Sequence, residues 1–240
     1  IKNHAARLAQ GEFLLLLNND TVILQEDWLD TLVTIGLRPD VGAVGCRLIY
    51  PNHSVQHAGI IVGLGGGADH IGIGLPLGKP GYMGRAQLSQ NFSAVTAACL
   101  LVRRGVFLEV DGLDEQDFAV LFNDVDFCLK LGARGYRIVW TPAVTLIHQG
   151  SSTLQASADA GRLARSRREQ FALIEKWRAR LIHDPAYNRH LSLRYRDWRV
   201  DEAMDGAWHP EFDPLPRVVA LPCDTAGVGH YRTIGPVSAL

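Results

Sequence analysis

Polar residues that could bind a metal directly follow the apolar run at residues 13–17, where Asn18, Asn19 and Asp20 stand in succession. In open α/β sheets, ligands bind outside the carboxyl ends of the strands, so side chains placed there are well positioned to act. Asn18 and Asp20 offer an amide oxygen and a carboxylate to one centre, and hard divalent cations prefer such oxygen ligands. The pattern therefore predicts a metal site. The competing interpretation is an Asx-rich turn that caps the following helix.

A second acidic cluster comprises Asn123, Asp124 and Asp126. Asn123 is a favourable helix N-cap and Asp126, three residues later, imitates a capping box, so capping accounts for these two residues. Capping does not require Asp124. The helix N-terminus favours an ionised carboxylate there, and a general base must be ionised to accept a proton. Asp124 is therefore a candidate general base.

His148 ends a third apolar run, residues 144–147. A lone histidine at a strand end is typical of a hydrogen-bonded structural residue. Imidazole and carboxylate together are nevertheless a common ligand set for manganese-type ions. We therefore predict that His148 and Asp20 approach one another at the carboxyl ends of their strands.

The hydrophobic pattern predicts the elements that hold these residues. Continuous apolar runs predict strands, the first of them buried on both faces of a parallel sheet, and helical spacing or composition predicts helices. The long segment 63–84 is rich in glycine and proline and is predicted to be a loop. We interpret it either as a mobile flap over the substrates of the candidate site or as a surface loop without a role. The predicted strands are 13–17, 41–50, 55–62, 93–102, 136–140 and 144–147, and the predicted helices are 1–10, 26–37, 104–110, 123–133 and 158–181.

Composition narrows the class of function. The net charge of −1 gives no global field for nucleic acid. A content of 47% hydrophobic and 20% charged residues is ordinary for a soluble globular protein. The longest apolar run is far shorter than the roughly 20 residues that span a bilayer, and no signal peptide is recognisable. We expect a cytoplasmic protein.

The four cysteines, Cys46, Cys99, Cys128 and Cys223, show no CxxC pairing. The first three lie among apolar residues. We interpret them as buried, reduced thiols of a cytosolic protein rather than as disulfides or zinc ligands.

Four ordered segments carry a family resemblance: GEFLLLLNNDT, IYPNHSVQHAG, SAVTAACLLVRRGVFLEVDGLDE and NDVDFCLKLGARGYRIVWTPAVTLIHQGSS. Together they resemble the family 2 inverting glycosyltransferases of bacterial cell-surface polysaccharide synthesis, over about residues 3–152 and more loosely to 193. The resemblance implies an α/β, A-type glycosyltransferase fold (Rossmann-like, nucleotide-diphospho-sugar transferase) with a helical C-terminal extension. That fold normally begins with strands that hold the nucleotide base, so we expect a piece of a longer protein, truncated at the N-terminus.

The resemblance also implies roles for single residues on the metal side. Asp20 stands in the Asp-x-Asp motif of the family and would bind the Mn²⁺ or Mg²⁺ that bridges the donor diphosphate. His148 matches a histidine that completes the metal shell in some members. Asn18 replaces the first aspartate of the motif, on the donor side.

On the acceptor side, the resemblance makes Asp124 the general base. Asn123 departs from the usual Glu-Asp pair of the family. On the donor side, a short segment matches the segment that lines the donor-sugar pocket in the family; it contains Thr96, Ala97 and Ala98.

The implied function is metal-dependent, inverting transfer of a sugar from a nucleotide-sugar donor to a hydroxyl of a glycan or lipid-linked acceptor, in the hexosyltransferase class. The alternative is a catalytically inactive, glycosyltransferase-like binding or scaffolding domain, which the asparagines at 18 and 123 favour. A dinucleotide-binding oxidoreductase is disfavoured. The pattern G-x-G-x-x-A at residues 63–68 is followed by glycines and prolines rather than by the helix that the fingerprint requires.

We divide the chain into a partial catalytic domain (1–155), a helical extension and linker (156–213) and the start of a second α/β domain (214–240). The last of these resembles the opening of a B-type glycosyltransferase domain. Residues 161–199 carry 11 Lys and Arg against 4 Asp and Glu. This charge is either a solvated helix face or a contact with anionic lipid headgroups or a lipid-diphosphate acceptor, at the inner face of the cell membrane.

Overall fold

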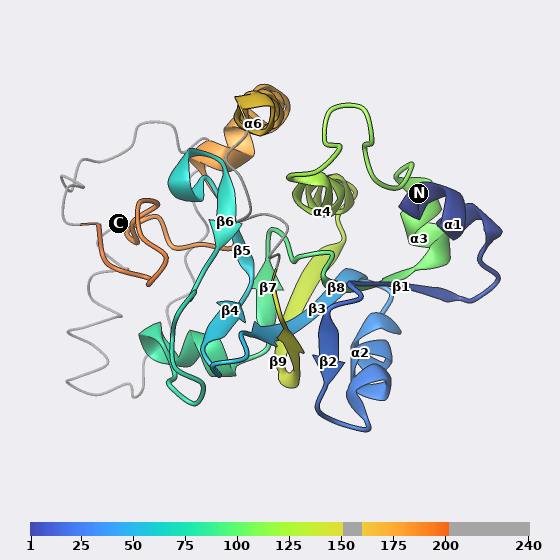
Figure 1. Ribbon diagram of the computed structural model, residues 1–240, viewed down its shortest axis with the longest axis horizontal. Helices are drawn as coiled ribbons and strands as arrows, with labels where there is room; N and C mark the ends of the chain where they lie inside the picture. The colour runs from blue at the N-terminus through green and yellow to red at the C-terminus, as the bar shows by residue number, and fades with distance from the viewer. Residues whose placement is uncertain (151–159, 202–240) are drawn as a thin grey trace, which may run out of the picture. The chain divides into compact units, whose positions relative to one another are not determined.

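A computed structural model describes residues 1–150 and 160–201 (Figure 1). Its centre is a mixed sheet in which the described strands follow the order β1-β8-β3-β9-β2, with β4 beside β3 and β7 beside β9. Among these described strands, β3 and β9 alone pair in parallel, and the other neighbours are antiparallel. The strands are β1 (Phe13–Leu17), β2 (Thr21–Ile23), β3 (Val41–Ile49), β4 (Val55–His57), β7 (Gln90–Phe92), β8 (Cys99–Arg103) and β9 (Arg137–His148).

Helices cover both faces of this sheet. Figure 1 shows α4 on one face and α2 on the other. A hairpin of β5 and β6 lies outside the main sheet. The helices are α1 (Lys2–Leu8), α2 (Trp28–Gly36), α3 (Arg104–Glu109), α4 (Asn123–Ala133) and α6 (Ala160–Ile182); the hairpin strands are β5 (Ile60–Val62) and β6 (Ala68–His70), and two 3₁₀ helices are η1 (Leu64–Gly66) and η2 (Tyr82–Gln87).

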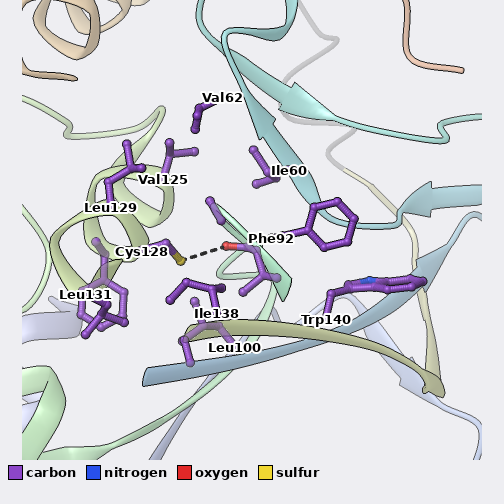
Figure 2. Packing of buried hydrophobic residues seen from close by; sticks show 14 of the residues in the cluster. Ile60, Val62, Phe92, Leu100, Val125, Cys128, Leu129, Leu131, Ile138 and Trp140 are labelled. Atoms are coloured by element: carbon purple, nitrogen blue, oxygen red, sulfur yellow. Dashed lines mark hydrogen bonds between the residues drawn. The ribbon is translucent and has the colours of Figure 1, made fainter. Parts of the chain in front are cut away.

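Two apolar clusters follow from the alternation of side chains along the strands. Figure 2 shows the cluster beneath α4, where Cys128 points toward the sheet and Trp140 and Ile138 lie below it. The opposite cluster packs Leu32 of α2 against Val44 of β3 and further strand residues. The sheet therefore forms the middle layer between helices, as in other α/β folds.

The strand predictions need five corrections. The segment 13–17 does form a strand, but β1 is only partly buried and pairs antiparallel with β8, so the predicted parallel setting is wrong. The segments 136–140 and 144–147 are one continuous strand, β9. The segment 55–62 divides into β4 and β5 around Gly59, whose φ of +102° is a conformation that favours glycine. Within 93–102 only β8 is a strand, and the loop 63–84 contains β6.

The helix at 123–133 is confirmed as α4, but its start differs from the capping prediction. The N-cap is Phe122, with a φ of +61° and no side-chain capping bond, and Asn123 is already helical. Asp126 is fully buried inside the helix rather than closing a capping box. Asp126 instead contacts side chains of α6, as described below.

The described residues all belong to one compact unit, Ile1–Glu202. The predicted domain boundaries at 155/156 and 213/214, the segment 214–240 and Cys223 lie outside the described residues. Cys46, Cys99 and Cys128 are buried and free, as predicted. Within residues 1–150 and 160–201, no helix is both long enough and apolar enough to cross a membrane.

Candidate functional site

Strand pairing brings the two predicted metal ligands together. In the antiparallel pair of β2 and β9, Thr21 stands opposite His148, so Asp20 and the end of β9 are neighbours. The backbone N–H of Gln149 donates to the carbonyl of Asp20 at 3.1 Å. Asp20 Oδ1 lies 3.1 Å from His148 Nε2. The predicted approach of these two side chains is therefore confirmed.

Gln56 decides which nitrogen of His148 carries the proton. Its amide oxygen Oε1 lies 2.6 Å from His148 Nδ1, and its Nε2 donates to the His148 carbonyl at 3.4 Å. An amide oxygen can only accept, so Nδ1 is the donor. In the neutral ring, Nε2 then presents its lone pair toward Asp20 Oδ1 and toward Nδ2 of Asn18, which lies 3.2 Å away.

This arrangement fits a divalent cation. A ring lone pair and a carboxylate oxygen repel each other at 3.1 Å unless a proton or a cation lies between them. Metal-binding histidines characteristically donate their other ring N–H to a fixed acceptor, which is the role that Gln56 fills. Within the described part of the chain, no three His, Cys, Asp or Glu side chains form a ready metal cluster. Asp20 and His148 can thus supply two ligands to an ion that takes its other oxygens from substrate and water, as Mg²⁺ commonly does.

Asp124 lies in the first turn of α4 and is held by two backbone groups. Its Oδ2 accepts the N–H of Ala97 and its Oδ1 accepts the N–H of Val125, both at 2.9 Å. Each carboxylate oxygen keeps a second lone pair. The carboxylate is therefore fixed in direction and still able to accept a proton.

The segment predicted to line the donor pocket connects the two halves of the site. Thr96, Ala97 and Ala98 are buried and precede β8. The carbonyl of Ala98 accepts the N–H of Asn18 at 3.0 Å, while the N–H of Ala97 binds the candidate base. This three-residue segment thus ties the metal half of the site to Asp124.

Asn123 is not joined to this network by the bonds described. Its Nδ2 donates to the carbonyl of Val120 at 3.3 Å, which closes a local turn before α4. This contact supports the turn that precedes the base.

Sequence reasoning missed a pair of histidines beside the site. His57 is buried, and its Nδ1 lies 3.1 Å from Nδ1 of His70 on β6. Burial holds the pKa of His57 well below its usual value, and the positive forms of His70 and His148 act in the same direction. Burial also lowers the pKa of His70, although the Asp124 and Asp69 carboxylates oppose this shift. The polar pair Gln56-His57 within an apolar strand was the signal that could have found this region.

Comparisons with known proteins extend these observations. No protein-family model matches the chain. It is 41% identical over 198 residues to the uncharacterized protein y4gI of Sinorhizobium fredii, a match that covers 82% of this chain and 22% of that protein. It is also 41% identical over 200 residues to the O-antigen biosynthesis protein RfbC of Myxococcus xanthus, with coverage of 82% and 15%. The chain thus spans about a fifth or less of the length of these relatives.

Among solved structures, the chain resembles GalNAc-T7, determined with UDP, GalNAc and Mn²⁺. The TM-score is 0.52 at 12% sequence identity, and the match covers 75% of this chain and 35% of GalNAc-T7. At this identity the likeness shows the fold alone. The mixed α/β sheet with helices on both faces has the A-type glycosyltransferase fold.

Proposed function

We propose that this chain is the catalytic part of a family 2 glycosyltransferase that transfers a sugar from a nucleotide-sugar donor to a hydroxyl of a glycan or lipid-linked acceptor, with inversion. The observation that carries the proposal is the 3.1 Å approach of Asp20 Oδ1 to His148 Nε2, with Gln56 Oε1 facing the other ring nitrogen. The relative from M. xanthus, named for O-antigen biosynthesis, supports a role in cell-surface polysaccharide synthesis. The solved structure of GalNAc-T7 with UDP, GalNAc and Mn²⁺ supports a nucleotide-sugar donor and a divalent cation.

In this proposal Asp20 and His148 hold Mn²⁺ or Mg²⁺, and Gln56 fixes the histidine ring. Such an ion neutralises the charge that develops on the leaving diphosphate. Asn18 Nδ2 lies 3.2 Å from His148 Nε2, so the amide of Asn18 lies beside the same atoms. As a neutral residue, it adds no second carboxylate to the site.

Asp124 is the general base. The acceptor hydroxyl oxygen attacks the anomeric carbon from the face opposite the diphosphate, the bond to the diphosphate breaks, and the hydroxyl proton passes to the Asp124 carboxylate. The bonds from Ala97 and Val125 hold the two carboxylate oxygens in place during this step.

The test is a donor screen with the complete protein, scored by release of nucleoside diphosphate with Mn²⁺ and with a chelator. We expect release from one nucleotide sugar that depends on the metal and is lost in Asp124→Asn. Donor and metal binding without turnover, under every acceptor tried, would support the alternative of a binding or scaffolding domain. No binding of any donor would overturn both.

We also propose that α6 contacts an anionic membrane surface peripherally, at the inner face of the cell membrane. Phe171 is 65% exposed, and the exposed Arg167 and Arg168 lie one helical turn before it on the same face. An apolar side chain flanked by cations suits a lipid headgroup region, where each cation contributes about 1 kcal/mol. Flotation with vesicles that contain anionic lipid should recover the protein, and neutral vesicles should not. Equal recovery of a Phe171→Ser, Arg167→Ser variant would contradict the proposal.

A further inference from the structure

One helix far along the chain contacts the segment that precedes the candidate base. Glu169 of α6 is fully buried, and its Oε2 accepts the backbone N–H of Leu121 at 2.6 Å. Leu121 stands three residues before Asp124, in the turn that leads into α4. Burial of a carboxylate costs free energy unless the group is hydrogen-bonded. The bond from the Leu121 N–H to Glu169 therefore fixes the position of that turn.

The same helix also contacts the chain two residues after the base. Asp126 is fully buried and accepts a hydrogen bond from Trp177 Nε1 at 2.8 Å. Its carboxylate also pairs with Lys176 at 2.9 Å, and Lys176 reaches Asp114 at 3.0 Å. These contacts, with that of Glu169, attach α6 to the chain on both sides of Asp124. We refer to the contacts made by Glu169, Lys176 and Trp177 as the α6 clamp.

The turn between these anchors is strained and needs such support. Phe122 has a φ of +61°, a left-handed conformation that is unfavourable for a bulky residue. Strained residues of this kind persist only where the surrounding structure fixes them. The bond from Leu121 to Glu169 lies immediately before Phe122, and the carbonyl of Phe122 accepts the N–H of Asp126 at 2.8 Å.

We propose that Glu169 and Trp177 are positioning residues, which act through the turn at Phe122 to hold Asp124 in the direction needed to receive the acceptor proton. This inference rests on the proposed role of Asp124 as general base. Asp20 and His148, by contrast, are oriented by Asn18 and Gln56 and by the pairing of β2 with β9. Loss of the clamp should therefore lower kcat and leave the affinity for donor and metal unchanged.

Two variants of Glu169 differ in whether they can accept the hydrogen bond from the Leu121 N–H. Glu169→Leu removes the acceptor of the Leu121 N–H, and Glu169→Gln keeps it. Glu175→Leu is the matched control, because Glu175 is exposed on the same helix and pairs only with Arg178 among the contacts described. Displacement of a catalytic group by about 1 Å can cost about 10²-fold in rate. For Glu169→Leu we expect kcat to fall by about tenfold or more at an unchanged donor KM, with Glu169→Gln restored to within about twofold and Glu175→Leu unaffected.

Trp177→Phe removes the N–H that binds Asp126 and retains an aromatic, though smaller, side chain, so it decides the question if Glu169→Leu does not fold. Unchanged kcat in both Glu169→Leu and Trp177→Phe would overturn the inference. So would a loss in Glu169→Gln as large as in Glu169→Leu. Amide hydrogen exchange over residues 121–126 gives a readout that does not need activity, and faster exchange there in Glu169→Leu than in Glu175→Leu is expected. A wild-type protein that binds no donor refutes the proposed function, whereas equal exchange in these two variants refutes the clamp.

Discussion

Gln56 Oε1 accepts a hydrogen bond from His148 Nδ1 at 2.6 Å, and this bond leaves the other ring nitrogen to Asp20. The two residues are 92 positions apart in the sequence. They meet because β4 and β9 both pair with β3, so the ends of these strands are brought to one place. The orientation of the proposed metal ligand His148 thus depends on a side chain far away in the sequence.

This relationship predicts that Gln56→Leu weakens Mn²⁺ binding by about 10–100-fold, the range typical for loss of an outer-shell partner of a metal ligand. Leucine has a similar size but accepts no hydrogen bond, so the ring of His148 can turn or change tautomer. Calorimetric titration of Mn²⁺ measures the effect. Gln10→Leu, at an exposed position outside the site, is the control. Equal affinity in wild type and Gln56→Leu would show that the amide does not orient the ligand.

Asp124→Asn should lower transfer by about 10²–10⁴-fold, because an amide cannot accept the acceptor proton. The two oxygens of Asp124 each accept a backbone N–H, and asparagine can replace only one of these acceptors. A modest loss of stability, about 1–3 kcal/mol, is therefore expected as well. Steady-state rates and thermal unfolding of the same preparation separate the two effects. Comparable proportional losses in rate and in stability would instead indicate a structural role.

The pH dependence of stability should carry the signature of His57. Burial depresses the pKa of this histidine in the folded state, helped by the neighbouring His70 and His148, so the unfolded chain binds its proton more readily. Stability is then fully present above the unfolded pKa of about 6.5 and is lost as the pH falls from there toward the folded pKa.

His57→Asn removes this titration and keeps a polar atom near the position of Nδ1. We expect the fall in melting temperature between pH 7.5 and pH 5.5 to be smaller in the variant than in the wild type. Burial also lowers the pKa of His70; Asp124 and Asp69 oppose this shift, and Arg196 adds to it. Part of the fall in melting temperature therefore remains in the variant. An identical fall in both proteins would show that His57 does not titrate in this window.

The parts of this site that could be predicted from the sequence are those set by local patterns. The apolar runs before Asp20 and His148 define two strand ends, and the 3.6-residue spacing after Asn123 defines α4 with its bounds at 123 and 133. Because ligand-binding residues gather at one edge of such a sheet, the approach of Asp20 to His148 followed from these ends.

The remaining features depend on contacts between distant segments. The spacing predicts a capping role for Asp126, because its partner Trp177 lies 51 residues away on a helix whose sequence carries no local sign of this contact. Gln56 reaches His148 because of the register between β3 and β4. The hydrophobic pattern does not determine this register for a segment as short as β4. The left-handed turn at Phe122 has no local signature, since bulky residues rarely adopt it.

The last prediction concerns the segment 63–84. It is held by backbone bonds to the chain after α6: the N–H of Gly65 donates to the carbonyl of Leu193 at 2.9 Å, and that of Gly72 to the carbonyl of Arg196 at 2.6 Å. The ring of Trp198 packs so closely on Gly72 that a Cβ there would lie 2.8 Å from it. If the segment is a flap that becomes ordered when donor and metal bind, these contacts of Gly65 and Gly72 become tighter on binding. Hydrogen exchange of the complete protein with donor and Mn²⁺ should then show slower exchange at Gly65 and Gly72 than without them, and exchange in α2 serves as the reference. If saturating donor and metal leave exchange across 63–84 unchanged, the segment is a surface loop without a part in binding.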